Sequence, residues 1–399
     1  GIRDRDVTGV QTCALRSRAI QHWNKQKFGS VGNAVREAEN RLARIEGSVE
    51  TSRLEEEDPA ELNMARADLN RALAVEEQFW RQKARVKWLG CGDRNTRFFH
   101  AVVKQRRVQG AIHRVKDSNG SWVDRDEDIA QVAVEYFSNL FSGPVDTGGG
   151  DLMHLIPKLV SDEENERLAA IPSMEEIRHL VFSMDGESAA GPDGFTGKFF
   201  SFAWEVVAQD VYKAVVSFFC GSHLPKFLTS TSIVLLPKVS NPQDFSNFRP
   251  ISLCNFCNKL LSKWMVSRMT LVLPKLISPQ QTGFVKGRSI SDNYLLAQEL
   301  MASIGKKARG GNVALKLDMT KAYDRMSWFH VISMLRAFGF CEQIIDMIWR
   351  LISNVWFSII INGSAQGFFK SCRVLCHGDP LSPVLFVIGS ELLSRGLNE

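Results

Sequence analysis

Apolar residues occupy every second position from 313 to 317, and small or polar residues stand between them. An alternation of this period is typical of a half-buried β-strand. Gly310 and Gly311 interrupt the chain just before this stretch, and Asp318 follows its last residue. The pattern therefore predicts a strand that carries Asp318 at its end.

Helical spacing follows this stretch and returns near the C-terminus. Between residues 329 and 338 the apolar residues stand three or four positions apart, which predicts a helix with Ser327 as its N-cap and Gly339 as its stop. Apolar residues from 384 to 393 form a second such face, and Ser382, which a proline follows, is the predicted N-cap there.

A β-hairpin is predicted between these two helices. Residues 356–361 are rich in strand-forming side chains, and Asn362-Gly363 is the favoured two-residue turn before a return through Phe368 and Phe369. We expect this hairpin to extend the sheet of the Asp318 strand and to have no catalytic role.

The N-terminal part of the chain has a helical composition. Residues 34–45 and 61–89 are rich in Ala, Glu, Arg and Leu, and the acidic stretch 55–59 separates them. This predicts a helical extension over 18–89, arranged as a helical hairpin or coiled-coil arm, with heptads too short to predict dimerisation. Residues 142–151, rich in glycine, form the clearest linker.

Composition and charge narrow the class of protein. With 399 residues, 44% of them apolar, the chain has material for two or three domains. No stretch approaches the roughly 20 apolar residues of a membrane span, so we expect an intracellular protein without a membrane partner, in nucleus or cytoplasm. The net charge of +5 permits nucleic-acid binding without requiring it.

The eight cysteines are irregularly spaced, which indicates reduced thiols rather than a disulfide framework. Cys254 and Cys257 have the spacing of zinc ligands, and Cys372, Cys376 and His377 could complete a site. Because the two groups lie far apart in the sequence, free thiols are favoured over structural zinc.

Positive charge concentrates between residues 81 and 107, where Asp93 is the only acid and aromatic residues are interleaved. Cations that neutralise phosphates beside rings that stack on bases are typical of an RNA-binding surface. The alternative is a solvated helix face with core aromatics. The predicted nucleic-acid contacts are Arg81, Lys83, Arg85, Lys87, Arg94, Arg97, Lys104, Arg106 and Arg107.

Asp318 is the main catalytic candidate. Phosphoryl transfer by two metal ions needs carboxylates from at least two chain segments, because two dications held close together must be neutralised. After Asp318 the chain contains no adjacent Asp-Asp pair. A lone Asp at a strand end is more often a solvated turn residue, so its sequence context has to decide.

That context is a series of six sequence blocks. The blocks are 190–195 (Ala-Gly-Pro-Asp-Gly-Phe), 233–238 (Ile-Val-Leu-Leu-Pro-Lys), 247–253 (Asn-Phe-Arg-Pro-Ile-Ser-Leu), 283–293 (Gly-Phe-Val-Lys-Gly-Arg-Ser-Ile-Ser-Asp-Asn), 315–324 (Leu-Lys-Leu-Asp-Met-Thr-Lys-Ala-Tyr-Asp) and 378–383 (Gly-Asp-Pro-Leu-Ser-Pro). In this order they resemble the reverse transcriptase, an RNA-directed DNA polymerase, of plant non-LTR retrotransposons of the long interspersed class. Residues 88–100 are similar to the segment that precedes the polymerase in these elements.

The resemblance implies an α+β protein with the right-hand polymerase fold, in which fingers and a truncated palm follow an α-helical N-terminal extension. It implies a basic connector at 90–141, fingers and palm entry at 152–312, and a palm at 313–399 that stops before the Asp-Asp motif. A longer parent protein with an upstream endonuclease is implied as well. We therefore expect this fragment to be inactive alone.

The resemblance also implies the site residues. Asp318 would be the first metal-binding carboxylate, with the Met319 carbonyl assisting, for Mg²⁺ or Mn²⁺. Tyr323 matches the aromatic steric gate that excludes a 2′-hydroxyl, although an ordinary packing aromatic is the alternative. The implied partners are an RNA template, a DNA primer and deoxynucleoside triphosphates.

Four further residues are implied to approach nucleotide or template. Lys238 and Arg249 fall in the fingers, where an ordinary surface charge is the alternative. Gly378 and Asp379 belong to a palm loop that supports the nascent base pair.

Two stretches depart from the family pattern. Residues 373–377 read Arg-Val-Leu-Cys-His where the family usually reads Arg-Gly-Leu-Arg-Gln, as in a decayed element copy. Residues 7–17 resemble a translated sequencing adapter, so 1–17 are treated as an artefact. The alternatives are therefore a non-catalytic RNA-binding or assembly module and a non-functional relic, with a group II intron maturase as the related enzyme.

Overall fold

The computed structural model describes residues 29–51, 59–84, 96–143, 150–307 and 309–397, together with His22 and Gln26. The adapter-like residues 1–17 lie outside the described residues. The chain divides into two compact units, which meet in the sequence between Ala111 and Ile112.

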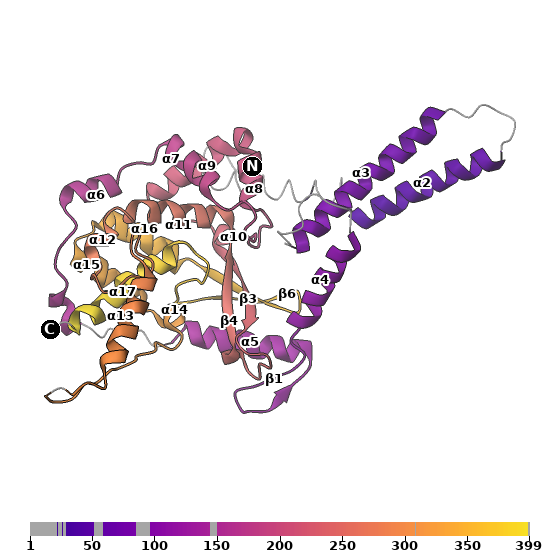
Figure 1. Cartoon of the computed structure of the whole chain (residues 1–399). Coiled ribbons are helices and arrows are strands. Elements are labelled where there is room, and N and C mark those ends of the chain that lie inside the picture. Colours follow the sequence, from indigo (N-terminus) through magenta and orange to yellow (C-terminus); the bar gives the residue numbers. More distant parts are fainter. Residues whose placement is uncertain are drawn as a thin grey trace. The chain divides into compact units, whose positions relative to one another are not determined.

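The first unit is helical (Figure 1). It contains α2 (Val31–Thr51), α3 (Pro59–Ala84) and α4 (Thr96–Gly110). The predicted helical hairpin is confirmed over the described residues, since α2 and α3 pack along each other and the Arg41 guanidinium lies 2.9 Å from the Asp68 carboxylate.

The second unit is built on a four-stranded sheet with the order β4-β3-β5-β6. Its strands β3 and β4 form an antiparallel pair, β5 and β6 form another, and β3 joins β5 in parallel. The parallel pairing unites two parts of the chain that are distant in the sequence. The strand bounds are β3 (Ser230–Pro237), β4 (Phe248–Cys254), β5 (Trp356–Ile361) and β6 (Ser364–Lys370).

One face of this sheet is covered by α5 (Asp126–Phe141). Phe137 and Phe141 of the helix are buried in one cluster with Phe357 and Ile359 of β5. The linker predicted at 142–151 therefore falls inside the second unit, because the helix before it packs on a sheet whose strands come after it. A small β-ribbon of β1 (Val115–Lys116) and β2 (Trp122–Val123) precedes α5.

Most of the remaining helices pack around a second core, and Figure 1 shows their arrangement. Trp264 and Met265 of α11 are fully buried there with Leu335 and Phe338 of α15, and Ile388 of α17 joins them. None of the described helices is long and apolar enough to cross a membrane. Besides α5, the described helical elements of the second unit are η1 (Gly150–Leu155), α6 (Asp162–Leu168), α7 (Met174–Ser183), α8 (Gly197–Phe202), α9 (Trp204–Phe219), α10 (Lys226–Thr229), η2 (Phe245–Asn247), α11 (Phe256–Met269), α12 (Leu273–Leu276), α13 (Ile290–Ser303), α14 (Ala322–Arg325), α15 (Trp328–Phe338), α16 (Glu342–Ser353) and α17 (Leu381–Gly396).

The strand predicted at 313–317 does not form. Residues 311–319 have no regular structure, all of 311–320 are exposed, and Leu315 is 85% exposed. An extended segment becomes a stable strand only when neighbouring strands and packing support it, and no described strand pairs with this one. The prediction was wrong because alternation sets which face is apolar but supplies no pairing partner.

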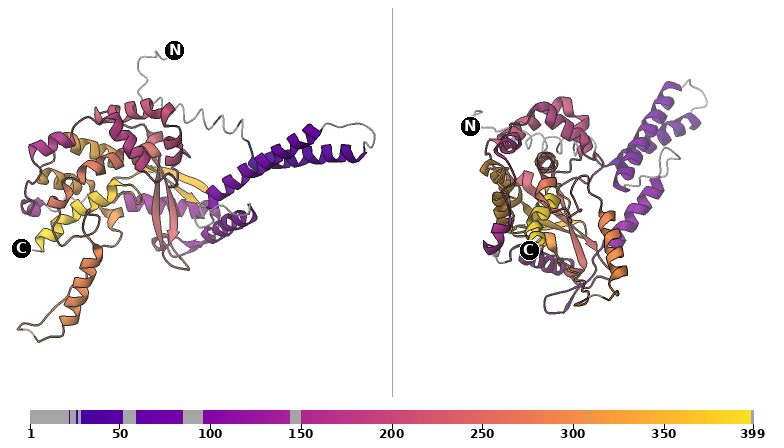
Figure 2. Two further views of the ribbon diagram at one scale, coloured as in Figure 1. Left: turned by 45° about the horizontal axis from the view of Figure 1, so that its top comes forward. Right: turned by 60° about the vertical axis from the view of Figure 1, so that its left-hand side comes forward.

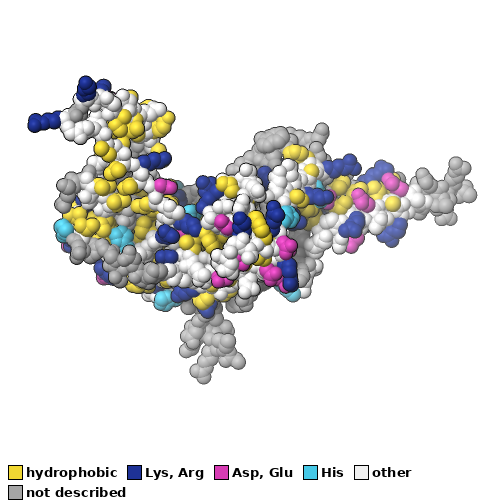
Figure 3. All heavy atoms as spheres, turned by 90° about the horizontal axis from the view of Figure 1, so that it is seen from below, with side chains coloured by type: hydrophobic (Ala, Val, Ile, Leu, Met, Phe, Trp, Pro, Cys, Tyr) yellow, Lys and Arg dark blue, Asp and Glu magenta, His cyan; other side chains and the backbone are white. Residues whose placement is uncertain are grey.

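α13 shares this exposure. It buries none of its residues, and it projects from the rest of the second unit (Figure 2). On the face seen in Figure 3, hydrophobic side chains lie open to solvent among lysines and arginines. Asn312 connects the two exposed segments, since its side-chain amide donates to the carbonyls of Ile304 and Lys306, at 3.1 Å each.

Two local predictions are confirmed. α15 spans Trp328–Phe338, where the Ser327 hydroxyl accepts from the His330 amide at 3.4 Å and Gly339 ends the helix at φ +93°. The β5–β6 hairpin turns at Asn362 and Gly363, which have φ +48° and +88°. The hairpin joins β3, however, and not the stretch before Asp318.

The predicted start of the last helix needs a correction. α17 begins at Leu381, one residue before the predicted cap Ser382. The carboxylate of Asp379 accepts from the Leu381 amide at 3.0 Å. A carboxylate two residues ahead of the helix thus takes the role that the sequence assigned to a serine.

Candidate functional site

The best-defined part of the site surrounds Tyr323. Lys321 adopts a left-handed conformation, φ +55°, that turns the chain into α14, so that Tyr323 points into the unit. Its ring stacks on Phe386 of α17 with centroids 4.8 Å apart at 13°, and the His377 ring lies 4.9 Å from it. Burial raises the pKa of the Tyr323 phenol. The ring is thus held by two others and keeps one orientation.

His377 also joins two chain segments. Its carbonyl accepts from the Ser252 amide of β4 at 2.8 Å. Its Nε2 lies 3.4 Å from Oδ1 of the buried Asp324, yet that oxygen accepts no hydrogen bond from the described residues. The pair is therefore a charge contact that exists only when His377 is protonated.

Asp379 belongs to the loop that follows His377, and its side chain points into the protein. Its carboxylate is buried and accepts from the Leu381 amide and from the Ser262 side chain, and burial raises its pKa to about 6. It lines a small enclosed pocket with Asn258 and Cys376. Because the carboxylate points inward, a nucleotide contact at this loop would have to come from the backbone, so the predicted role of Asp379 stays a prediction.

Gly378 lies close to strand β4. Its φ is +105°, a conformation that other residues rarely adopt. An added Cβ would lie 3.1 Å from the Ser252 carbonyl oxygen. Both constraints require glycine here, and the loop is thereby held against the edge strand β4.

The two predicted fingers cations lie at one end of the β3–β4 hairpin. Arg249 pairs in register with Leu236, and the Lys238 amide donates to the Asn247 carbonyl at 2.8 Å. Both side chains are exposed, although the Lys238 ammonium also donates to the Ser246 carbonyl at 2.9 Å. Arg249 is on the strand whose Ser252 holds His377, so the structure ties these cations to the loop.

Asn255, which the sequence did not single out, fastens another block to this strand. Its side-chain oxygen accepts from the Asp193 amide at 3.0 Å, and its amide donates to the Phe227 carbonyl at 2.7 Å. A Cβ on Gly191 would lie 2.5 Å from the Asn255 backbone nitrogen. The block at 190–195 is therefore docked onto the end of β4.

Arg288 has a similar structural role. Its guanidinium donates to four carbonyls within one turn of chain, those of Pro274, Ile277, Ser278 and Gln281, at distances between 2.6 and 2.9 Å. A guanidinium saturated in this way holds a loop together and has little left for a phosphate. The arginine inside a family block was the available sequence signal.

Asp318 stands apart from this packed region. It lies in the exposed stretch 311–320, and the neighbouring Met319 is 46% exposed. Within the described ranges, no three His, Cys, Asp or Glu side chains form a group that could hold a metal ion. The described residues therefore do not by themselves fit the implied Mg²⁺ or Mn²⁺, and they give no zinc site from the cysteines.

The structure describes only part of the basic segment 81–107. Arg85, Lys87 and Arg94 lie outside the described residues. In α3, Lys83 lies over the Phe79 ring at 4.2 Å, and burial, together with repulsion from Arg107, lowers the pKa of its ammonium. The predicted contacts that are exposed in the described helices are Arg81, Lys83, Arg97, Lys104, Arg106 and Arg107.

The aromatic residues of this segment that the structure describes are already in contact with other side chains. The Trp80 ring packs on His100 with centroids 3.6 Å apart, and Phe99 is 4% exposed. Arg106 donates to the Ala84 carbonyl. The rings therefore fit the core-packing alternative, and the nucleic-acid contacts of the cations stay a prediction.

Comparison with known proteins gives one family. Residues 236–399 match the family described as reverse transcriptase (RNA-dependent DNA polymerase). The transposon TX1 uncharacterized 149 kDa protein of Xenopus laevis is 25% identical over 310 residues, which are 77% of this chain and 24% of that protein.

Two relatives carry names of retrotransposable elements. The retrovirus-related Pol polyprotein of element R2DM from Drosophila melanogaster is 25% identical over 67% of this chain and 24% of its own length. That of element R2 from Bradysia coprophila is 24% identical over 76% of this chain and 35% of its own length. The chain thus spans about a quarter to a third of these relatives. Residues 236–399 thus match the reverse transcriptase family, and the relatives named here include Pol polyproteins of R2 retrotransposable elements.

Proposed function

We propose that this chain supplies the fingers and part of the palm of an enzyme that copies an RNA template into DNA from deoxynucleoside triphosphates. The observation that carries the proposal is the packed assembly of Tyr323, His377 and the Gly378 loop against β4. It lies within the residues that match the reverse transcriptase family.

In this proposal the site residues have distinct roles. Tyr323 is the ring beneath the sugar of the incoming nucleotide, and its stacking on Phe386 keeps it in place. A fixed ring discriminates against a 2′-hydroxyl by steric exclusion. Lys238 and Arg249 attract the triphosphate or template from the hairpin end. The backbone at Gly378 supports the base pair.

Asp318, with the Met319 carbonyl, is the proposed first ligand of the divalent metal. A metal held there would stabilise the charge that develops on the reacting phosphate. The remaining carboxylates have to come from a segment outside the described residues, since these contain no such group. We therefore propose that the 399-residue chain does not polymerise alone.

Primer extension on an RNA template tests this proposal. The chain would be compared with a longer polypeptide from the same reading frame, each as wild type and as Asp318→Asn. We expect extension only by the longer wild type. Asp292→Asn, an exposed acid on α13 that receives the same change, is the matched control and should extend normally. Templated extension by the 399-residue chain would defeat the proposal that it is inactive alone.

Nucleotide choice gives a second readout on the longer polypeptide. Tyr323→Ala should raise the use of ribonucleotides relative to deoxynucleotides, because the ring that excludes the 2′-hydroxyl is gone. Phe329→Ala changes another exposed aromatic ring and should leave the ratio unchanged. If Tyr323→Ala left the ratio of ribonucleotide to deoxynucleotide use unchanged, Tyr323 would have a packing role and no role in sugar discrimination.

The exposed cations of α3 and α4 favour a second candidate, a non-catalytic RNA-binding module. In this alternative the chain binds RNA strongly at low salt whatever the state of Asp318. Arg97→Gln with Lys104→Gln should weaken that binding, and Arg36→Gln with Arg44→Gln on α2 is the control. RNA binding without any extension by the longer polypeptide would favour this alternative over the polymerase.

A further inference from the structure

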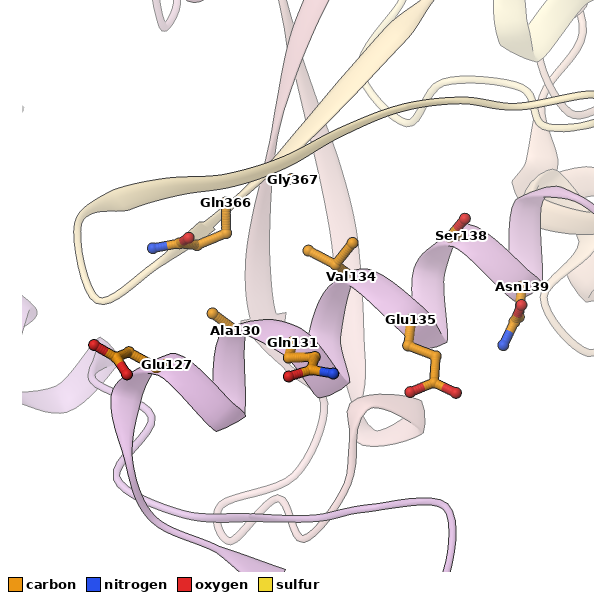
Figure 4. Close-up of a pocket in the computed structure, with 9 residues that line it drawn as sticks. All are labelled: Glu127, Ala130, Gln131, Val134, Glu135, Ser138, Asn139, Gln366 and Gly367. Carbon is orange, nitrogen blue, oxygen red and sulfur yellow. The ribbon is translucent and has the colours of Figure 1, made fainter.

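The two faces of the four-stranded sheet differ in charge. On one face, α5 and β6 enclose a groove lined by Glu127 and Glu135, with no lysine or arginine among its lining residues (Figure 4). None of the four strands contains an acidic residue. The acidity of the sheet's surroundings on that face thus comes from α5.

The opposite face carries aromatic rings and cations. The rings of Trp356 and Phe368 stack with centroids 5.0 Å apart at 13°, and the Lys226 ammonium lies 4.1 Å from the centre of the Trp356 ring. Lys370 is the register partner of Trp356 across the β5–β6 pair, so their side chains share this face. A cation, two rings and a second cation are therefore gathered at one end of the sheet.

Phe368 is the open end of this stack. Trp356 stands on β5 between Lys226, which precedes β3, and Phe368, which stands on the edge strand β6. Phe368 nevertheless remains 53% exposed, and Lys370 is exposed as well. A ring that served only to pack on Trp356 would not need an adjacent exposed cation on the same strand face.

The sheet surface beside the rings carries small side chains. Ser230, Trp356 and Lys370 form one row across β3, β5 and β6, and Ser232 with Ser358 forms the next row. The Ser230 hydroxyl donates to the Lys226 carbonyl at 2.7 Å. The small hydroxyl side chains of Ser232 and Ser358 leave room above the sheet and offer hydrogen bonds to a sugar or phosphate. An exposed ring, flanking cations and an open sheet surface form the combination that receives single-stranded nucleic acid in several unrelated folds.

We propose that this face binds single-stranded nucleic acid, with a base stacked on the free side of Phe368 and a phosphate beside Lys370. The occupant is anionic because Lys226 of α10 and Lys370 of β6 flank the rings, and none of the four strands contains an acid. The surface lies within the second unit, and its ring stack is made by residues other than those that stack on Tyr323. Its binding needs no metal and no nucleotide.

Photocrosslinking of the full chain tests the location. A fluorescent oligouridine of eight nucleotides with one 5-iodouridine would be bound in EDTA, irradiated and mapped by mass spectrometry. We expect a crosslinked peptide from β5 or β6. The absence of any crosslink in residues 356–370 would overturn the proposal.

Substitutions at the ring separate stacking from simple burial. Phe368→Leu should weaken oligouridine binding by about 5- to 100-fold, the range expected for one lost base–ring stack. Phe368→Trp should retain the affinity. Phe202→Leu is the matched control, since Phe202 on α8 is 91% exposed, and it should bind as the wild type does.

Affinity equal to wild type in Phe368→Leu would contradict the proposal. A second result would also contradict the proposal: a peptide or protein that competes with oligouridine for this face and still binds Phe368→Leu. The exposed ring would then be explained by apolar contact with that partner and not by base stacking. Lys370→Gln should reduce the slope of the logarithm of the binding constant against the logarithm of salt concentration by about 1, because one fewer counterion is released. Cooperative unfolding of each variant at the wild-type temperature would show that the fold is retained.

Discussion

Two adjacent segments of this chain have opposite fates. Residues 311–320 are exposed throughout, although three of them alternate as strand residues do. Directly after them, α14 and α15 are packed, and Leu335 and Phe338 are completely buried. The difference shows that an apolar pattern gives a stable element only where the fold supplies a surface to cover it.

The contrast has a functional meaning under the proposed polymerase. The parts that would meet the nucleotide, Tyr323 and the Gly378 loop, are held by contacts within the described residues. The part that would hold metal, Asp318, has no such support. In the proposed polymerase the nucleotide side is therefore held in place, whereas the described residues add no further ligand group on the metal side.

The largest expected difference between the two segments is in folding stability. Leu335→Ala removes a fully buried side chain of α15 and should lower the free energy of unfolding by about 2–5 kcal/mol. Leu315→Ala makes the same chemical change at an exposed site and should change it by less than about 0.5 kcal/mol. Urea unfolding of both variants measures this, and equal losses would abolish the contrast.

Asp379 predicts a pH dependence of the packed side. Burial raises its pKa from the ordinary 3.8 to about 6. The folded chain then binds a proton that the unfolded chain has released, so this group stabilises at low pH and the stability falls as pH rises from about 4 to 7. Two pKa units correspond to about 3 kcal/mol.

Unfolding by urea across this pH range checks the effect. Asp379→Asn keeps a cap oxygen but cannot ionise, so its stability relative to wild type should improve as pH rises. Asp292→Asn, at an exposed acid, should follow the wild type at each pH. If the free energies of unfolding of wild type and Asp379→Asn changed in parallel with pH, the raised pKa of the Asp379 carboxyl group would be contradicted.

The start of α15 should give a smaller effect. Ser327→Ala removes the hydroxyl that caps the helix and should cost about 1 kcal/mol. Ser382→Ala should cost less, because Asp379 and not Ser382 caps α17. Chemical unfolding of the two variants compares them, and a larger loss in Ser382→Ala would reverse the assignment of the cap.

The smallest effect is expected at Asp318 itself. Asp318→Asn should leave the free energy of unfolding within about 0.5 kcal/mol of wild type, because the side chain is exposed. The same unfolding experiment measures it. A loss above about 1 kcal/mol would mean that Asp318 has a partner in the folded chain.

Local chemistry accounts for what the sequence predicted well. Ser327 and Gly339 fix the ends of α15 through their own backbone and hydroxyl groups, and Asn362-Gly363 turns the hairpin by adopting positive φ. These features depend on residues a few positions apart, and a single sequence contains that information.

The site depended on contacts that no local pattern contains. His377 entered the sequence analysis as a zinc candidate, and only the fold placed it between Tyr323 and Ser252. Phe386 was one apolar residue of a helix face until it met Tyr323. The exposed Asp318 stretch was missed for the converse reason, because its pattern implied a partner strand that the described residues do not provide.

Hydrogen exchange along the chain tests the central contrast most directly. The account predicts that amides from 313 to 319 exchange at nearly the rate of an unstructured peptide, while those of α15 and α17 are strongly protected, since only the latter are hydrogen-bonded and buried. Protection of 313–319 comparable to that of α15 would show a paired strand at Asp318. Such protection would mean that the metal side of the proposed polymerase site is already formed in this chain.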